Sequence, residues 1–441
     1  MTCHLLGLVG IMANADLESR GASLNDTILA KFPMVVPDAV KFPQSKKILR
    51  ARRTPIKIRA ENQTYSSNNN KQIRILFPNN ALYDLRCGYL TCDITVTTTG
   101  GTYRRLAQGS FSAFERLHIL FGSAEIEDLR DYNRLQNIIW NTTVLPEVTS
   151  AIGINMGFGT QGQRNVWATG QNLVVPLHSG VLNSCLWPTH AMNGGMIIEL
   201  YIADPTTCVE TDGTVPIITI SNLILHVERL ELDQNYMSFV KSFIQSYGLQ
   251  IGFPSYERYV NSMNTGSQQN LTINNRNSSV DGFYNIFVNS SEISNTTVND
   301  KFILWTNSIN LTQYNMLING MIFPDEPVDA LTNNSQEPYQ IYCRNAGKWK
   351  LNGQISMWPA IPAQFFPDDQ FIFIMDMEPF PEMALEGNNL ITPFTTLGNN
   401  ATIILNLTFG GVIAANYQTD TWVRFFKQVS IYKNGSVNVL Q

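Results

Sequence analysis

Alternation of apolar and polar side chains with a period of two is the feature that most restricts the fold of this chain. In residues 90–97, Leu90, Cys92, Ile94 and Val96 share one face, and Thr and Asp residues occupy the other. The same kind of pattern recurs along the chain at 73–77, 196–202, 217–232, 371–377 and 403–409. Because successive side chains of a strand point to opposite faces, each segment buries one face and exposes the other. The pattern predicts an all-β protein built of sandwiches.

The distribution of strands and helices predicts two β units. The long strand at 217–232 should contain a bulge or bend, because its apolar phase shifts near Asn222. Helical signals are few: Glu127 to Trp140 has apolar residues at helical spacing, whereas Asn235 to Gln245 fits either a helix or a continued strand. Long loops separate the strands, and loops of such length usually carry contacts. We expect one β unit at 54–232 and a second at 233–441.

The low content of charged residues restricts the class of protein. Charged residues make up 15% of the 441 residues, whereas an average soluble protein has about 25%. Uncharged polar residues, above all Asn, Ser and Thr, fill the difference. A surface of this kind argues against a freely diffusing enzyme with a coat of mixed charges, and against a protein that binds nucleic acid along its whole length. No apolar run reaches the about 18 residues of a membrane span.

Positive charge is concentrated near the N-terminus, although the net charge of the chain is −5. The densest cluster consists of Lys46, Lys47, Arg50, Arg52 and Arg53. A basic segment on an acidic body indicates contact with an anionic partner, and a solvated linker is the alternative interpretation. We expect residues 1–53 to form a basic N-terminal arm.

The residues that usually carry chemistry do not form a recognisable site. The 6 Cys are scattered, which suits free thiols rather than a disulfide framework. The 5 His form no metal-binding pair, and His118 and His226 lie among apolar strand residues, as structural histidines do. Residues 157–162 fit GxGxxG, but no helical pattern follows them, so they do not predict a dinucleotide site. We expect no catalytic, cofactor-binding or metal site, no cofactor and no small-molecule substrate.

Two further features keep other functions open. Glu228 with Glu231, or Asp376 with Glu378, could form the carboxylate pair of a β-sandwich glycosidase, which needs a separation of about 5–9.5 Å across a cleft. Asn-x-Ser/Thr sequons recur along the chain, together with aromatic residues that could bind sugars, namely Trp349, Trp358 and Trp422. These features favour, respectively, a hydrolase and a secreted or surface glycan-binding β-sandwich protein.

Five segments follow one another in a characteristic order. They are 79–97, 112–128 leading into the helix around Tyr132, 175–203, 277–288 and 423–439. In this order the chain resembles the double jelly-roll major capsid proteins of double-stranded DNA viruses, in particular those of virophages and polinton-like viruses. The resemblance covers about residues 55–441. It carries over no set of Cys or His ligands and no catalytic motif.

The resemblance implies two consecutive eight-stranded jelly-roll β-sandwiches, at 54–232 and 233–441, with a few short helices and long loops. It also implies a homotrimeric, pseudo-hexameric capsomer that tiles an icosahedral virion shell around double-stranded DNA, with assembly inside the host cell. Penton and minor capsid proteins would be further partners. Low surface charge suits lateral packing, because charges would have to be desolvated there. The basic arm would then contact genome or membrane, or a minor capsid protein, on the inner side.

A third alternative is the capsid protein of a small virus with one jelly roll and very long insertions. It would contain one sandwich core, so two separate sandwiches would exclude it.

Overall fold

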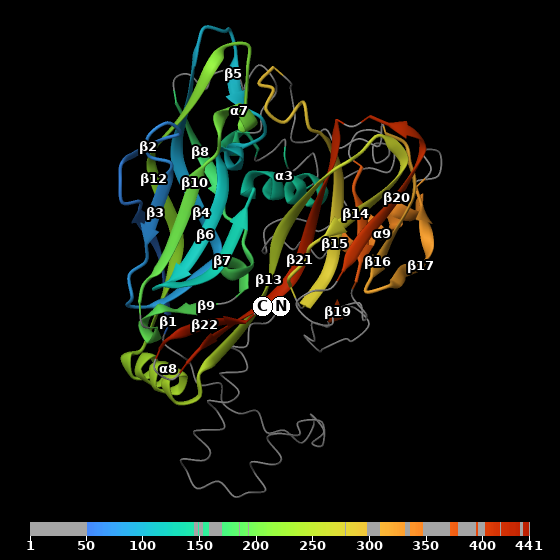
Figure 1. The fold of residues 1–441 in the computed structure, drawn as a ribbon. Helices are drawn as coiled ribbons and strands as arrows, with labels where there is room; N and C mark the ends of the chain where they lie inside the picture. The colour runs from blue at the N-terminus through green and yellow to red at the C-terminus, as the bar shows by residue number, and fades with distance from the viewer. Residues whose placement is uncertain are drawn as a thin grey trace, which may run out of the picture.

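The computed structural model describes most of the chain from Ala51 onwards. The described residues are 51–144, 149, 153–157, 170–184, 186–192, 194–277, 279–297, 309–330, 336–346, 371–377, 394–395, 402–414, 416–432 and 435–440. Antiparallel strands dominate, and they form two β-sandwiches that lie side by side (Figure 1). The prediction of an all-β protein is therefore confirmed.

The first sandwich packs a sheet of order β1-β12-β4-β8 against a sheet of order β3-β10-β6-β7. These strands are β1 (Ala51–Arg59), β3 (Gln72–Leu76), β4 (Leu82–Thr99), β6 (Phe114–Phe121), β7 (Ala124–Arg130), β8 (Gln171–Pro176), β10 (Met196–Ile202) and β12 (Thr214–Leu232). Four shorter strands complete it: β2 (Thr64–Ser66), β5 (Arg104–Leu106), β9 (Leu186–Pro188) and β11 (Val209–Thr211). Strand β2 pairs with β12, β9 pairs with β4, and β5 pairs with β11.

The second sandwich packs a sheet of order β13-β21-β15-β18 against a sheet of order β14-β20-β16-β17. These strands are β13 (Leu249–Ser262), β14 (Gly266–Ile273), β15 (Ser279–Asn289), β16 (Leu311–Ile318), β17 (Met321–Asp329), β18 (Phe373–Asp376), β20 (Ile403–Ile413) and β21 (Tyr417–Ile431). Two short strands, β19 (Phe394–Thr395) and β22 (Val437–Leu440), pair with β15 and β21.

Both sandwiches have the same topology. When the eight principal strands of each are counted in chain order, one sheet always contains the first, eighth, third and sixth strands, and the other contains the second, seventh, fourth and fifth. This is the arrangement of an eight-stranded jelly roll. The expected pair of consecutive jelly rolls is thus confirmed, and the interpretation as one jelly roll with long insertions is wrong. We call the sandwiches the first and the second roll.

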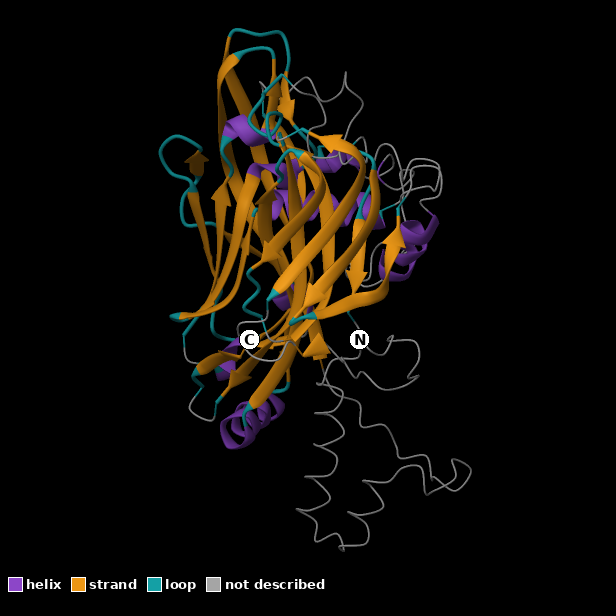
Figure 2. Ribbon diagram, turned by 45° about the vertical axis from the view of Figure 1, so that its right-hand side comes forward, coloured by secondary structure: helices purple, strands orange, loops and turns teal. Residues whose placement is uncertain are grey.

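The helices are short and lie at the margins of the sheets (Figure 2). They are α3 (Tyr132–Thr143), α6 (Gly180–Ser184), α7 (Pro205–Cys208), α8 (Gln234–Tyr247) and α9 (Gln336–Ala346), with 3-10 turns η2 (Ser110–Ala113), η3 (Gly153–Met156) and η5 (Thr189–Ala191). Helix α8 resolves the alternatives for residues 235–245 in favour of a helix. The expected helix over 127–140 is wrong at its start, because residues 127–130 pair with β6 as part of β7. Asp131, in a left-handed conformation, separates this strand from α3. Within the described residues, no helix is long and apolar enough to cross a membrane.

The alternating segment in β4 packs as its pattern predicts, whereas residues 371–375 are buried on both faces. Leu90, Cys92, Ile94 and Val96 are completely buried on one face of β4. The predicted bend in β12 is present, since its pairing with β4 shifts register between Ser221 and Ile224, and Asn222 adopts a positive φ of 53°. The apolar phase shift in the sequence therefore marks the place where the strand changes its pairing.

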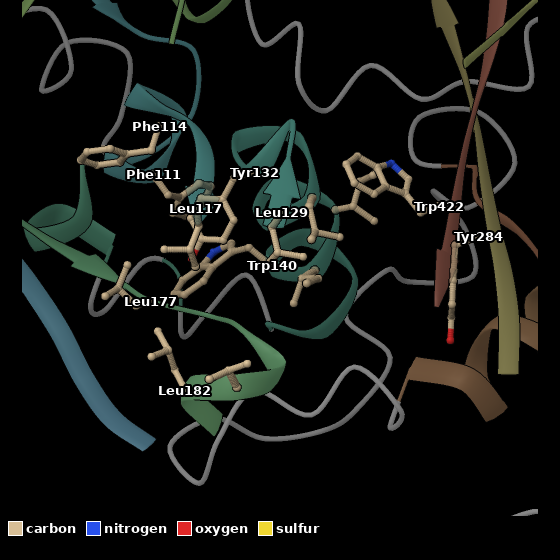
Figure 3. Packing of buried hydrophobic residues seen from close by; sticks show 14 of the residues in the cluster. Phe111, Phe114, Leu117, Leu129, Tyr132, Trp140, Leu177, Leu182, Tyr284 and Trp422 are labelled. Atoms are coloured by element: carbon tan, nitrogen blue, oxygen red, sulfur yellow. The ribbon is translucent and has the colours of Figure 1, made fainter. Parts of the chain in front are cut away.

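Buried apolar side chains of both rolls belong to one continuous cluster. Trp140 of α3 and Trp422 of β21 are both almost completely buried and belong to one cluster of buried apolar residues. Figure 3 shows Trp422 extending from the second roll toward the side where Leu129 and Trp140 of the first roll lie. Burial of a large apolar side chain contributes about 1.5–3 kcal/mol. The shared cluster therefore stabilises the pair of rolls as well as each roll.

Candidate assembly site at the seam between the two rolls

The two rolls meet along one edge strand of each. Strand β7 ends a sheet of the first roll, strand β13 ends a sheet of the second, and these two strands contact each other. Among the described strands, β7 pairs with β6 and β13 pairs with β21, but no backbone ladder joins β7 to β13. Side chains therefore make this contact, which we call the seam.

A buried carboxylate forms the centre of the seam. Glu127 of β7 accepts hydrogen bonds from the Ser179 hydroxyl at 2.6 Å and from the Gly180 and Val181 N–H groups at 3.2 Å, at the start of α6. It also accepts one at 3.2 Å from the hydroxyl of Ser255, which lies in β13 of the second roll. Complete burial raises the pKa of Glu127, and these donors oppose the rise. Glu127 thereby connects a strand, a helix and the neighbouring roll.

A second group of buried charges crosses the seam. Asp420 of β21 has a side chain that is 1% exposed, and it lies between the guanidinium groups of Arg134 at 3.3 Å and Arg258 at 2.5 Å. Arg258 also pairs with Asp131 of the first roll at 2.9 Å. Asp420 and Arg258 of the second roll pair with each other, and each also pairs with a residue of opposite charge in the first roll, Arg134 and Asp131 respectively. Loss of Asp420 would leave the guanidinium groups of Arg134 and Arg258 largely buried without this counter-charge.

Further cross-roll bonds lie away from this centre. The Tyr342 hydroxyl of α9 donates to the Thr142 carbonyl of α3 at 2.6 Å, and the Thr211 N–H of β11 donates to the Thr296 carbonyl at 2.8 Å. Within the second roll, the guanidinium of Arg258 lies 5.9 Å from the centre of the Trp422 ring, within the range of a cation–π contact. The seam therefore holds the rolls at several separated points.

Close approach of the two backbones at the seam requires a glycine. A Cβ atom at Gly180 would collide with the Pro254 carbonyl oxygen of β13 and would lie 2.9 Å from the Phe253 ring. We expect Gly180→Ala to lower the free energy of unfolding by about 1–3 kcal/mol or more, because the backbone of the second roll would have to move. Chemical denaturation followed by far-UV circular dichroism measures this. Gly252→Ala is the control, since its Cβ would meet only the Lys427 carbonyl oxygen at 4.0 Å; equal losses in both variants would contradict the argument.

The basic cluster lies only in part within the described residues. Lys46, Lys47 and Arg50 lie outside them. Arg52 and Arg53 are exposed residues of β1, and Arg53 pairs with Glu228 and, at 3.6 Å, with Asp84. Because β1 begins at Ala51, residues 51–53 belong to a strand of the first roll.

The carboxylates considered for catalysis have other partners. Glu228 of β12 pairs with Arg53 of β1. Glu231 pairs with Arg229, which lies on the same strand, β12. Asp376 accepts a hydrogen bond from the Asn345 amide at 3.3 Å, and Glu378 lies outside the described residues.

The strand histidines have structural partners, as their positions predict. His118 lies between Glu125 and Glu199, at 3.0 Å from each. His226 stacks on Tyr89 with ring centres 4.7 Å apart. In the part of the chain that the structure describes, His, Cys, Asp and Glu residues form no group of three that could hold a metal ion.

Sequence reasoning did not identify the seam residues. The available signal was the position of charged residues inside strands rich in aromatic residues, as at Arg258 between Tyr256 and Tyr259, or at Asp420 close to Trp422. Buried charges need partners. Each of these residues also has a partner in the other roll, and the identity of that partner does not follow from the alternating pattern.

Comparison with known proteins supports the fold at low sequence identity. No protein-family model matches the chain, and no curated protein matches it by sequence. Among solved structures, the PBCV-1 virus capsid matches with a TM-score of 0.61 at 11% identity, over 91% of this chain and 99% of that chain. The Faustovirus major capsid protein matches with a TM-score of 0.60 at 9% identity, over 92% and 94%.

The Sputnik virophage structure matches with a TM-score of 0.53 at 11% identity, over 91% of both chains. These likenesses extend over both rolls and confirm the resemblance drawn from the order of the sequence segments. At this level of identity they establish the fold: the chain has the double jelly-roll fold of viral major capsid proteins.

Proposed function

We propose that the chain is the major capsid protein of a double-stranded DNA virus and that it acts as a building block of the virion shell. The observation that carries the proposal is that the seam joins two rolls of the same topology within one chain. Three copies would then present six similar rolls around a three-fold axis, which is the geometry of a pseudo-hexagonal capsomer. Capsomers of this shape tile an icosahedral shell.

Three further observations support a structural role. The solved structures with the same fold are capsid proteins of PBCV-1, Faustovirus and Sputnik. The content of charged residues is 15%, so lateral contacts would bury few unpaired charges. Glu228 and His118 are held by ion pairs, and His226 stacks on Tyr89. We propose a non-enzymatic protein of the virion that assembles in the host cell together with penton and minor capsid proteins.

Particle mass and shape test this function. Purified protein should form a species of about 150 kDa, three times the 49.5 kDa of one chain, with a hexagonal outline in negative-stain images. A chain that remains monomeric both alone and with coexpressed capsid partners would contradict the proposal. Attached glycans together with a thermal stabilisation by sugars would instead favour the glycan-binding alternative.

We further propose that the residues before the first strand form a basic inner arm. Lys46, Lys47 and Arg50 would contact genome or membrane, with Arg52 and Arg53 at the junction to β1. Because β1 begins at Ala51, this assignment moves the end of the arm from residue 53 to residue 50, with the first roll ending at 232 and the second roll at 233–441. The inner arm would place positive charge against an anionic partner.

Deletion of residues 1–50 should leave the capsomer intact, because the first strand begins at Ala51. It should abolish salt-sensitive binding of double-stranded DNA, since counterion release makes such binding fall steeply with salt concentration. Electrophoretic mobility shifts at increasing salt measure the loss. Unchanged DNA affinity, together with unchanged packaging, would argue against the arm.

A further inference from the structure

The seam leaves one edge of each roll without a neighbouring roll. The fifth principal strand is β7 in the first roll and β17 in the second. The first principal strand is β1 in the first roll and β13 in the second. The seam joins the fifth strand of one roll to the first strand of the next. Within one chain, β17 and β1 lie on opposite sides of the molecule (Figure 1).

We infer that β17 of one copy docks against β1 of a second copy, and that this contact repeats the relation between β7 and β13 in the seam. The inference rests on the proposed function and names the surface through which copies associate. Because two different edges meet, the contact is heterologous. Such contacts close a ring of three copies when each contact rotates the next copy by one third of a turn. In a closed trimer, three seams would alternate with three β17–β1 contacts.

The distribution of charge supports this pairing. In the seam, the fifth-strand side contributes Glu127 and Asp131, and the first-strand side contributes Arg258. Strand β17 carries exposed acidic residues, Asp325 and Glu326. Its proposed partner, β1, carries positively charged residues. The proposed contact would thus bring an acidic fifth strand to a basic first strand, and the Asp131–Arg258 pair of the seam has the same polarity.

Strand β1 supplies the positive charge for the proposed contact. Lys57 and Arg59 are exposed and alternate with the buried Ile58, so their side chains point away from the core of the roll. Arg53 is exposed and in phase with Lys57 and Arg59, and it pairs with Glu228 of the neighbouring strand. This gives β1 an excess of positive charge along its exposed face.

The exposed side chains of β17 favour a contact through side chains. Pro324 and Pro327 cannot donate backbone hydrogen bonds, and neither can Pro55 of β1. Prolines of this kind occur on edge strands and oppose extension of the sheet by another strand. The seam likewise lacks a ladder between β7 and β13 among the described strand pairs. Met321 and Ile322, 60% and 52% exposed, would become buried beside the acidic residues.

Charge reversal tests the inference. One variant carries Asp325→Lys and Glu326→Lys in β17, and a second carries Lys57→Glu and Arg59→Glu in β1. Each places like charges opposite each other, so we expect association to weaken at least tenfold in mass photometry and analytical ultracentrifugation. The fourfold variant with all of these changes should regain the trimer, because the two edges are again of opposite sign. Lys241→Glu, on the exposed face of α8, is the control and should associate as the wild type does.

The outcomes separate the inference from the proposed function. If the wild type forms trimers and both charge-reversal variants form them equally well, the β17–β1 contact is wrong and the capsid proposal remains. The same holds if the fourfold variant is as weak as either double variant, provided that circular dichroism shows all variants folded. If the wild type never associates, the proposed function fails and the inference fails with it. Loss in each double variant with recovery in the fourfold variant supports the contact.

Discussion

Replacement of Asp420 by alanine should lower the free energy of unfolding by about 3–5 kcal/mol. Asp420 is the shared counter-charge of Arg134 and Arg258, whose side chains are 14% and 10% exposed. Without it, both guanidinium groups remain largely buried, and the carboxylate that still pairs with Arg258 is that of Asp131, which is 43% exposed. The cost arises from the uncompensated charge that remains, more than from the lost contact itself. Urea denaturation followed by tryptophan fluorescence measures it, because Trp422 is close to the site.

Glu231→Ala provides the matched control for this prediction. Glu231 also pairs with an arginine, Arg229, but the two side chains are 38% and 31% exposed. Solvent screens such a pair, so its loss should cost about 0–1 kcal/mol. If Asp420→Ala costs no more than Glu231→Ala, the charge network does not hold the rolls together. A loss of cooperativity confined to Asp420→Ala would show that the rolls unfold separately once the seam is broken.

Acidification should destabilise the folded chain between pH 6.5 and about 4 through one histidine. Burial lowers the pKa of His178 from 6.5 to about 4. Its backbone N–H donates to the Tyr132 hydroxyl at 2.9 Å, and the buried Nε2 atom of the ring has no hydrogen-bond partner among the described residues. Within this pH range, the unfolded chain binds a proton that the folded chain does not bind. The stabilising contribution is therefore complete above pH 6.5 and is lost as the pH falls, by up to about 3 kcal/mol.

Comparison of the wild type with His178→Gln isolates this effect. The free energy of unfolding, measured by urea denaturation at a series of pH values, should depend less steeply on pH in the variant. Other groups titrate too, such as Glu127, whose raised pKa acts in the opposite direction, but they are common to both proteins. His226→Gln, on a partly exposed ring, should keep most of the slope. Parallel curves for the wild type and His178→Gln would disprove the assignment.

A pH response of this kind bears on the proposed function. His178 lies directly before Ser179 and Gly180, which bind Glu127 at the seam. Protonation of its imidazole would place a charge in a buried region beside the contact between the rolls. We therefore expect acid to weaken the structure near the seam first, which hydrogen exchange can localise.

Helix α3 shows where local pattern and tertiary structure disagree. Residues 127–140 have apolar side chains at helical spacing, yet residues 127–130 belong to a strand. Over four residues, the same order of apolar and polar side chains fits both the helical and the strand periodicity. Pairing with β6 decided between them. A strand at this place bonds to the backbone N–H and C=O groups of β6, which a helix would leave without these partners.

Alternation along the chain predicted most of the strands, the buried face of β4, the bend in β12, and the succession of two β units. These properties depend on neighbours along the chain, because the alternation of side chains in a strand is local. Which strands are edges, and which charges meet, depends on the tertiary structure. Glu127 and Ser255 are 128 residues apart, and Arg134 and Asp420 are 286 residues apart. Their contact results from the packing of two whole rolls, and no local periodicity encodes that packing.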